Sequence, residues 1–292
     1  AAELRESGLA AYAAAAYREP TTLIRGSAQI FSASGVRQGD QCGPALFSLA
    51  LARFLAAAPP VVWAGWYLDD GYVQGTAAQL SAWLSFVSES GPAAGFFLNL
   101  AKCELFGPPP QHLSEDSPLL TVPRPPPETL MVLGANITLA GAEEQWEGLA
   151  QRVMAQANAF SAVGGADPTA ALLLLRSCGG AVALGYFMRC LPPPIRSDSL
   201  KYVDIAVFKA IEACVGPMSP EAAQQVRLPL RVGGLGIPPV EPLSPIAHFS
   251  SLMTCAELYH EFCPVTSFQL SDCTSHTSLA PFPSALIEMS QV

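Results

Sequence analysis

Two adjacent carboxylates, Asp69 and Asp70, are the residues of this chain best suited to metal chemistry. They follow a β-prone run, 61–68, and Gly71 comes directly after them. An Asp-Gly pair between two β-prone runs predicts a hairpin turn. Along a regular strand neighbouring side chains point to opposite faces, but at a hairpin tip both carboxylates can approach one site. Because Mg²⁺ prefers oxygen ligands, the pair predicts a site for Mg²⁺ or Mn²⁺.

The β-prone run ahead of the carboxylates is apolar, with Val61, Val62, Trp63 and Trp66 in it. This composition is unusual for an exposed edge strand, so we expect the carboxylates to stand at the end of a buried strand. Taken alone, an Asp-Asp-Gly sequence is better explained by a solvated turn without function. The neighbouring segments therefore decide between the two interpretations.

A glycine-bracketed loop, 35–40, lies ahead of the carboxylates. It offers backbone N–H groups and the side chains of Arg37 and Gln38 at the start of a predicted helix, 45–57, with Pro44 in its first turn. Phosphate and sugar oxygens bind well at such a helix start. The loop predicts a nucleotide contact, although an ordinary glycine-rich helix entry would have a similar sequence.

Lys102 follows the carboxylates, in a segment, 96–106, that we expect to form a strand, a turn and a second strand. A lysine beside a departing pyrophosphate can neutralise charge or donate a proton. By itself Lys102 is more simply a surface lysine. Its place after the loop and the carboxylates, in that order, gives it a possible role in the same chemistry.

The remaining patterns predict an α+β fold in two parts. Residues 1–137 carry the β-prone runs, and residues 138–292 are mainly helical. A proline-dense segment, 107–128, predicts an irregular insertion or linker. The other predicted elements are helices at 4–17 and 76–90, a hairpin at 21–33, a strand at 130–134, and helices at 143–163, 168–189, 195–215 and 220–225.

This ordered set resembles the reverse transcriptase domain of non-LTR (LINE-like) retrotransposons. The resemblance covers nearly the whole chain and is most specific from 35 to 105. The matching segments are residues 35–40 with 43–47 for motif B, Tyr67-Leu68-Asp69-Asp70-Gly71 for motif C, 95–103 for motif D, 133–137 for the primer-grip region (motif E), and 189–193 with 233–236 for the thumb and connection.

The resemblance implies a polymerase palm, an antiparallel sheet with helices, followed by a mainly helical thumb. It implies two-metal nucleotidyl transfer with an RNA template, a DNA primer and a dNTP as partners. It also implies residue roles: Asp69 and Asp70 bind the catalytic metals, Arg37, Gln38 and Gly39 contact the incoming nucleotide, Tyr67 lies near the primer end, and Lys102 faces the triphosphate.

Two departures from the family pattern bear on activity. The family continues Asp-Pro-Leu where this chain has Asp40-Gln41-Cys42. The family's motif A aspartate also has no counterpart, since only Glu3, Glu6 and Glu19 are acidic before Asp40. We therefore expect a catalytically incomplete chain that lacks an N-terminal fingers and palm segment, and its first residue, Ala1, is consistent with a cut inside a longer protein.

Composition favours a folded protein but argues against a strongly basic nucleic-acid surface. Half of the residues are hydrophobic, and 15 Lys and Arg face 24 Asp and Glu, for a net charge of −9. The alternative interpretation is thus a decayed retroelement remnant that binds nucleic acid or protein without catalysis. No apolar run predicts a membrane helix. We expect an intracellular protein, nuclear if it belongs to an active retroelement.

Eight cysteines are scattered along the chain without a Cys-x-x-Cys pair. Buried, reduced thiols are the simplest interpretation in a chain of this size. One group near the end of the chain offers a third interpretation, a metal-binding module, although its spacing matches no common zinc pattern. Its members are Cys255, His260, Cys263, Cys273 and His276.

Overall fold

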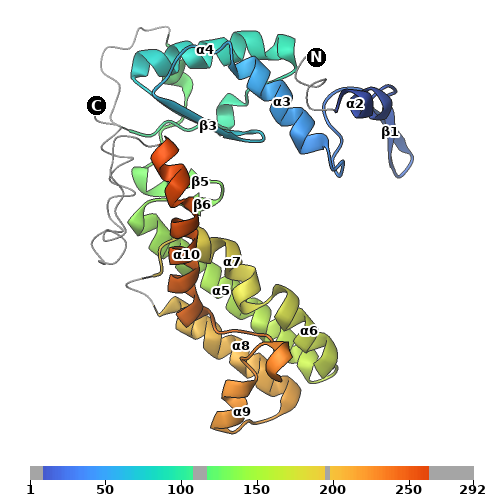
Figure 1. The fold of residues 1–292 in the computed structure, drawn as a ribbon, viewed down its shortest axis with the longest axis vertical. Coiled ribbons are helices and arrows are strands. Elements are labelled where there is room, and N and C mark those ends of the chain that lie inside the picture. The colour runs from blue at the N-terminus through green and yellow to red at the C-terminus, as the bar shows by residue number, and fades with distance from the viewer. Residues whose placement is uncertain (1–8, 108–116, 195–197, 263–292) are drawn as a thin grey trace. The chain divides into compact units, whose positions relative to one another are not determined.

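The structure is a computed structural model that describes residues 9–107, 117–194 and 198–262. The chain combines α-helices with small antiparallel two-stranded ribbons, so the expected α+β class is confirmed (Figure 1). It divides into two compact units, Ala1–Arg124 and Pro125–Val292.

The first unit contains the residues predicted to do polymerase chemistry. Its predicted hairpin at 21–33 is confirmed, with Arg25 paired to Ala28 around a two-residue turn. The helix behind Pro44 is confirmed as well. The described elements are α2 (Ala10–Ala16), β1 (Thr21–Arg25), β2 (Ala28–Ser32), α3 (Gly43–Leu55), β3 (Trp63–Tyr67), β4 (Asp70–Gln74), α4 (Ala77–Ala94) and the 3-10 turns η1 (Leu100–Lys102) and η2 (Pro118–Thr121).

Helix α4 has well-defined ends. Thr76 and Gln79 form a reciprocal capping box at its start, which satisfies two backbone N–H groups that the first helical turn leaves unpaired. The helix runs through Pro92 and ends at Gly95, whose φ of 86° terminates it in the left-handed conformation. The predicted end at 90–92 is therefore a few residues too early.

Helices α3 and α4 pack through aromatic side chains. Phe54 of α3 stacks on Phe86 of α4 with ring centroids 5.1 Å apart, and Phe96 lies 5.3 Å from Phe54. A hollow of about 650 Å³ remains between the two helices, lined mainly by alanine, leucine and these three rings. This apolar contact joins α3 to α4.

The expected strand, turn and strand at 96–106 is wrong. The segment instead forms the single 3-10 turn η1, closed by hydrogen bonds from Lys102 N and Cys103 N to the carbonyls of Asn99 and Leu100. Its apolar side chains do not alternate between the faces of a sheet, because Leu98, Cys103 and Leu105 pack against the small core beneath α4. Local turn formation with one-sided burial replaces the expected strands.

Part of the proline-dense segment belongs to that core. Residues 108–116 lie outside the described structure, and η2 follows them. Leu119 and Val122 are only 5% and 7% exposed and pack with Leu84 of α4. The segment is irregular, as expected, but its last part is not a linker, because it supplies buried side chains to the first unit.

The second unit is a helical bundle preceded by one short ribbon. Helix α5 packs along α8 and against α6, and α10 packs on α7 and α8. Trp146, Leu175, Leu184, Val203 and Ile211 are almost fully buried in its core. The elements are η3 (Pro127–Thr129), β5 (Met131–Val132), β6 (Ala135–Asn136), α5 (Leu139–Gly164), α6 (Pro168–Cys178), α7 (Gly180–Cys190), α8 (Ser199–Val215), α9 (Pro220–Gln225), η4 (Leu230–Val232) and α10 (Val240–Phe262).

Most predicted helices of this unit are confirmed, with two differences. The predicted helix 168–189 is interrupted at Gly179, where the backbone is extended, so that α6 and α7 are separate. Helix α10 was not predicted at all. The units divide at Arg124 rather than near 137, because the β5–β6 ribbon is tied to α5 by a hydrogen bond from Asn136 N to Gln145 Oε1.

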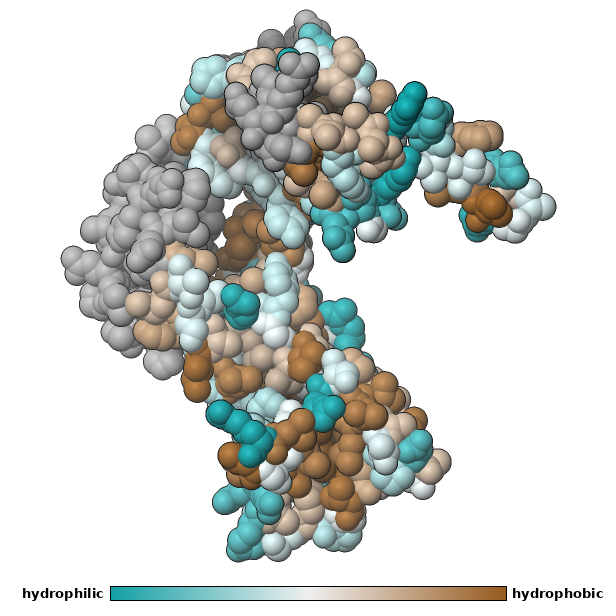
Figure 2. All heavy atoms as spheres, turned by 45° about the vertical axis from the view of Figure 1, so that its right-hand side comes forward, coloured by the Kyte–Doolittle hydropathy of each residue, from teal (hydrophilic) through white to brown (hydrophobic). Residues whose placement is uncertain are grey.

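One helical stretch in the described residues, Pro168–Cys190, is long and apolar enough to cross a membrane, with a mean hydropathy of 1.6 over its best window. Core helices of soluble bundles pass the same test. The stretch supplies Ala171, Leu175, Leu184 and Met188 to the bundle core. On the face drawn in Figure 2 the helical unit also carries exposed hydrophobic residues. This single stretch does not indicate a membrane.

Candidate functional site

The two carboxylates lie on a tight hairpin. Tyr67 of β3 pairs with Asp70 of β4, so Leu68 and Asp69 form the two-residue turn between them. Leu68 has a φ of 54°, which a non-glycine residue adopts only in tight turns. The turn therefore lies earlier in the chain than the Asp70-Gly71 pair predicted, at Leu68 and Asp69. Asp69 stands at the tip, and Asp70 is the first residue of the second strand.

Gly71 has a steric role in this hairpin. It pairs with Trp66, and a Cβ added to Gly71 would lie 2.5 Å from the Trp66 ring. The Trp66 indole therefore covers the backbone of Gly71, which only glycine permits. The cross-strand contact explains why Gly71 belongs to the strand and not to the turn.

Trp66 also fastens the hairpin to α4. Its ring stacks on Trp83 of α4 with the centroids 5.8 Å apart, and Trp83 is 7% exposed. On the opposite face of β3, Trp63 and Tyr67 are 40% and 63% exposed. The expected buried strand is therefore wrong: in the described residues β3 pairs only with β4, and one face of the ribbon is open.

Asp69 and Asp70 are both exposed. Asp70 lies directly opposite Tyr67 on the ribbon, so the two share the face that points away from Trp66. Two carboxylates side by side can offer oxygen ligands to one divalent ion. Within the described residues, no group of three or more His, Cys, Asp or Glu is arranged to hold a metal.

The glycine-bracketed loop is organised by Asp40. The Asp40 carboxylate accepts hydrogen bonds from Tyr12 Oη at 2.6 Å, from Tyr17 Oη, and from Cys42 N at 2.9 Å. Gly39 has a φ of 87°, the left-handed conformation that favours glycine. Helix α2 and the entry to α3 are thereby joined through one carboxylate.

Arg37 is held by the same cluster. Its guanidinium lies 5.0 Å from the centre of the Tyr17 ring and donates to the Glu19 carbonyl at 3.0 Å. Its backbone N–H donates to Tyr17 Oη at 3.2 Å. Arg37 therefore serves to fix the loop, while the neighbouring Gln38 is exposed and makes no hydrogen bond to the described residues. Of the nucleotide contacts predicted in this loop, Gln38 is the side chain left available.

The hydrogen bonds around Asp40 shift the pKa values of the groups that form them. Hydrogen bonds from Tyr12, Tyr17 and the Cys42 N–H stabilise the charged Asp40, so the pKa of this carboxyl is lowered. The same hydrogen bonds raise the pKa of Tyr12 to about 12 and raise that of Tyr17. Sequence reasoning missed both tyrosines. Their spacing on an alanine-rich helix carries no distinguishing signal, since the contact with Asp40 spans more than twenty residues.

The other predicted site residues lie on separate elements of the first unit. Lys102 is the last residue of η1 and is exposed, and Tyr67 is exposed on β3. The structure brings Arg37 and Asp40 into one cluster and sets Asp69 beside Asp70. Among the described residues no hydrogen bond joins Gln38 or Lys102 to the carboxylates, so the convergence of these residues on one site stays a prediction.

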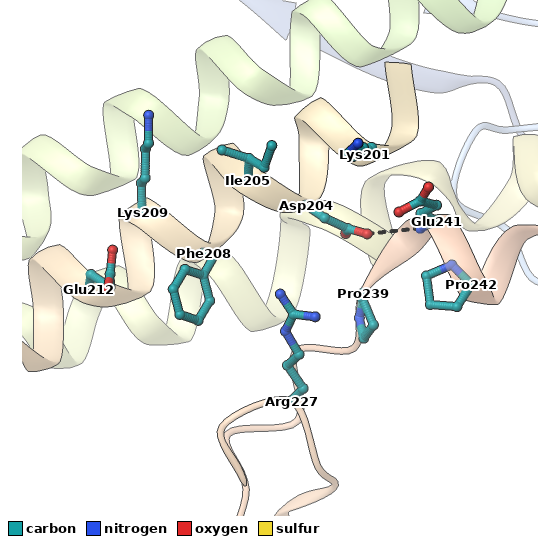
Figure 3. A pocket seen from close by; sticks show the side chains of 10 residues that line it. All are labelled: Lys201, Asp204, Ile205, Phe208, Lys209, Glu212, Arg227, Pro239, Glu241 and Pro242. Carbon is teal, nitrogen blue, oxygen red and sulfur yellow. Dashed lines mark hydrogen bonds between the residues drawn. The ribbon is translucent and has the colours of Figure 1, made fainter. Parts of the chain in front are cut away.

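The helical unit has a hollow of its own that the sequence did not suggest, about 500 Å³ in volume (Figure 3). Arg227 enters it from the loop after α9 and lies 5.5 Å from the centre of the Phe208 ring. At its edge Asp204 accepts hydrogen bonds from Val240 N at 2.6 Å and Glu241 N at 3.0 Å, at the start of α10. Burial raises the pKa of Asp204. The Asp204 carboxylate is thus engaged in capping α10.

The Cys/His group near the end of the chain is mostly outside the described residues. Cys255 lies on α10 and is exposed, while Cys263, Cys273 and His276 fall beyond residue 262. His260 is within α10, but its side chain is not described. The metal-binding interpretation of this group stays a prediction.

Comparison with known proteins yields no relative. The chain matches no protein-family profile, no curated protein and no solved structure.

Proposed function

We propose that this chain is a segment of an RNA-directed DNA polymerase, a reverse transcriptase of the non-LTR retrotransposon type, with residues 1–137 as a partial palm and 138–292 as a thumb and connection. One observation carries the proposal. The carboxylates of the Tyr-Leu-Asp-Asp-Gly box lie on the tip and first strand residue of a tight, exposed hairpin that Trp66 anchors to a buried tryptophan. A metal site needs this combination of open access and a fixed base.

In this proposal Asp69 and Asp70 hold Mg²⁺ or Mn²⁺ for two-metal nucleotidyl transfer. When bound there, the ions would supply activation of the primer hydroxyl and stabilisation of the leaving pyrophosphate. Gln38 contacts the incoming dNTP from a loop that Arg37 and Asp40 hold in place. Lys102 neutralises charge on the triphosphate.

Two carboxylates alone give an incomplete two-metal site. Asp69 and Asp70 offer oxygen atoms from one ribbon, and close like charges repel each other unless a metal lies between them. A further carboxylate must oppose them to hold both ions at a separation of about 3.5–4 Å. We propose that this ligand belongs to a segment that the 292 residues do not include, and that this chain alone does not extend primers.

Primer extension on an RNA template with Mg²⁺ tests the proposal. The comparison uses this chain and a version that continues upstream in the same coding sequence through the missing aspartate. We expect extension by the longer version only, and Asp69→Asn should reduce it by about 10³-fold or more, because a metal ligand is lost. Glu89→Gln is the matched control, since Glu89 is an exposed carboxylate on α4.

Three outcomes of this experiment would contradict the proposal or part of it. Extension by the short chain that Asp69→Asn abolishes would mean that a carboxylate within the chain completes the site. Equal activity of the longer version and its Asp69→Asn variant would remove Asp69 from the catalysis. No activity in the longer version, together with binding of an RNA–DNA duplex that Asp69→Asn leaves unchanged, would favour the decayed, non-catalytic binding module.

A further inference from the structure

Arg227 points its guanidinium into the hollow of the helical unit (Figure 3). The group lies 5.5 Å from the centre of the Phe208 ring, a cation–π contact that uses its face and leaves its N–H groups unused. Within the described part of the chain the guanidinium makes no hydrogen bond and no ion pair. The planar fork of an arginine matches an oxyanion such as a carboxylate. The hollow therefore offers a fork of donors to an oxyanion that enters it.

The acidic group beside Arg227 is engaged elsewhere. Asp204 lies at the edge of the hollow, and its charge interacts with that of Arg227. Its Oδ1 accepts from Val240 N at 2.6 Å and its Oδ2 from Glu241 N at 3.0 Å. These N–H groups belong to the start of α10, where a carboxylate is favourable. Because both oxygens of Asp204 bind α10, a second carboxylate is needed to pair with the Arg227 fork.

The loop that carries Arg227 is held on both sides of this residue. Leu235 N donates to the Val226 carbonyl at 2.9 Å, and Gly236 N donates to the Leu228 carbonyl at 2.9 Å. The two hydrogen bonds fix the backbone directly before and directly after Arg227. The guanidinium is thus placed before a ligand arrives, which lowers the entropic cost of binding.

Apolar side chains surround the guanidinium. Ile205 is 44% exposed on α8, one helical turn before Phe208. Pro239 and Pro242 line the hollow from the chain around the start of α10. In a space of about 500 Å³ this lining suits an oxyanion that carries an apolar group beside it.

The remaining charges of the hollow balance each other. Lys201 and Lys209 add two positive charges, and Glu212 and Glu241 add two negative charges. A nucleic-acid strand carries a phosphate at every nucleotide, so it would meet the two carboxylates as well as the cations, and like charges across an interface are unfavourable. A peptide with one carboxylate between apolar side chains fits better, because it brings one negative charge to one arginine.

We propose that this hollow binds an acidic, apolar peptide segment of a partner protein. One carboxylate of the peptide pairs with the Arg227 fork, and a neighbouring apolar side chain packs on Ile205 and Phe208. An Asp or Glu side chain and the carboxyl end of a chain both supply this chemistry. The inference is independent of the proposed polymerase chemistry, since all residues of the hollow belong to the second unit and none has a role in that chemistry.

NMR titration of the whole chain with three acetylated hexapeptides tests the inference. The first, Gly-Leu-Glu-Leu-Leu-Gly with an amidated end, carries one internal carboxylate. The second has Gln in place of Glu and the same amide, and the third has the Gln and a free carboxyl end. The readouts are the Nε–H signal of Arg227 and the methyl signals of Ile205. We expect the first or the third peptide to bind at least about tenfold more tightly than the second, as for one charge-assisted pair.

Arg227→Gln should remove that preference. Binding of the carboxylate peptide should weaken about tenfold, while binding of the peptide without a carboxylate should change less than twofold, with the Ile205 methyl signals as the readout. Arg231→Gln is the matched control, because Arg231 is an exposed arginine of η4 that does not line the hollow. This control should change the binding of either peptide less than twofold.

Four results would overturn the inference. They are an absence of shifts in both signals with either carboxylate peptide, equal binding of all three peptides, and equal losses in Arg227→Gln and Arg231→Gln. The fourth is a short single-stranded DNA that shifts the same signals at lower concentration than the peptides and loses binding in Arg227→Gln, which would make the hollow a nucleic-acid site instead.

Discussion

Trp66 of β3 stacks on Trp83 of α4 with the ring centroids 5.8 Å apart, directly behind the strand that carries Asp70. The ribbon has no other strand partner among the described residues, so this contact contributes much of what fixes the carboxylates. The Trp66 Nε1–H is buried without a hydrogen-bond acceptor in the structure, a cost that the stacking must outweigh.

Truncating the buried member of the pair should release the hairpin. Trp83→Ala removes a side chain that is 7% exposed, so we expect a loss of about 3–5 kcal/mol in the stability of the first unit. Trp63→Ala truncates the same residue type on the open face, where 40% is exposed, and should cost about 1 kcal/mol or less. Denaturant titration followed by circular dichroism measures both. Equal losses would show that the stacking does not anchor the ribbon.

Gly71 should not tolerate a side chain. Gly71→Ala places a methyl group 2.5 Å from the Trp66 ring, and the ring must move away, at a cost of about 1–3 kcal/mol. Gly148→Ala is the control, since a Cβ at this position of α5 meets no atom within 4 Å. There the change should stabilise by about 0.5–1 kcal/mol, because alanine favours a helix. Melting temperatures that move in the same direction for both variants would contradict the steric role of Gly71.

The end of the proline-dense segment should behave as core. Leu119→Ala removes a leucine that is 5% exposed, so we expect about 2–4 kcal/mol of destabilisation. Its neighbour Leu120 is 60% exposed, and Leu120→Ala should change stability by about 0.5 kcal/mol or less. Deletion of 108–126 should accordingly lower the melting temperature by about 10 °C or more. A deletion variant with the same melting temperature as the parent protein would support the linker interpretation instead.

Local signals in the sequence were sufficient where one residue type dictates the backbone. The hairpin at 21–33 and Pro44 at the start of α3 follow from turn and helix-start preferences that depend on near neighbours. The helices of the second unit follow from apolar periodicity. The break between α6 and α7 was missed, although Gly179 and Gly180 are adjacent and such a pair often marks a turn.

Contacts between residues far apart in the sequence could not be predicted from local sequence patterns. Whether β3 is buried depends on which other strands pair with it. A run of apolar residues does not show whether one face or both faces of the strand are covered. The cluster around Asp40 depends on hydrogen bonds from Tyr12 and Tyr17, which no spacing rule predicts. Asp69 and Asp70 were placed near the turn by their own Asp-Gly signal, although the pairing of Gly71 with Trp66 moved the turn by one residue.

The Asp40 cluster should be visible in tyrosine titration. The pKa of Tyr12 is raised to about 12 by its hydrogen bond to the Asp40 carboxylate. Asp40→Asn removes that charge, so the Tyr12 pKa should return toward its ordinary value of about 10. Carbon-13 NMR of labelled tyrosines, assigned with Tyr12→Phe, measures each titration. A Tyr12 titration that does not move in Asp40→Asn would contradict the hydrogen bond to Asp40 as its cause.

The pH dependence of that cluster has a definite sign. The pKa of Asp40 is lowered in the folded chain, so its contribution to stability is present above the unfolded pKa and is lost as pH falls through the folded value. The contact between α2 and the loop should therefore persist at pH 5 and weaken in more acidic solution. Proton chemical shifts of the Tyr17 ring report the contact. A contact that persists after Asp40→Asn would mean that the Arg37 ring stacking maintains it instead.

His248 should make the helical unit sensitive to mild acid. It lies on α10, is 9% exposed, and has a buried Nδ1 atom with no hydrogen-bond partner in the structure. One turn earlier, the Oγ atom of the fully buried Ser244 also lacks a partner. Burial lowers the pKa of His248, although a hydrogen bond to the Arg189 backbone partly opposes the shift. A proton on this ring would place an unpaired charge in the core.

The sign of the His248 effect follows from proton linkage. The unfolded chain binds a proton near pH 6.5 and the folded chain only at lower pH, so stability is full above about 6.5 and falls as pH decreases below it. Between pH 7.5 and 5.5 we expect the helical unit to lose about 2–4 °C in melting temperature through this residue. His248→Gln keeps a polar side chain without the titration, so it should reduce the pH dependence by that amount. Trp146 is the reporter, because it is the tryptophan of the helical unit, and fluorine-labelled tryptophan separates its signal from those of Trp63, Trp66 and Trp83. An unchanged pH slope in the variant would show that His248 is protonated in the fold without cost, and that solvent or a neighbouring acceptor reaches its Nδ1 atom.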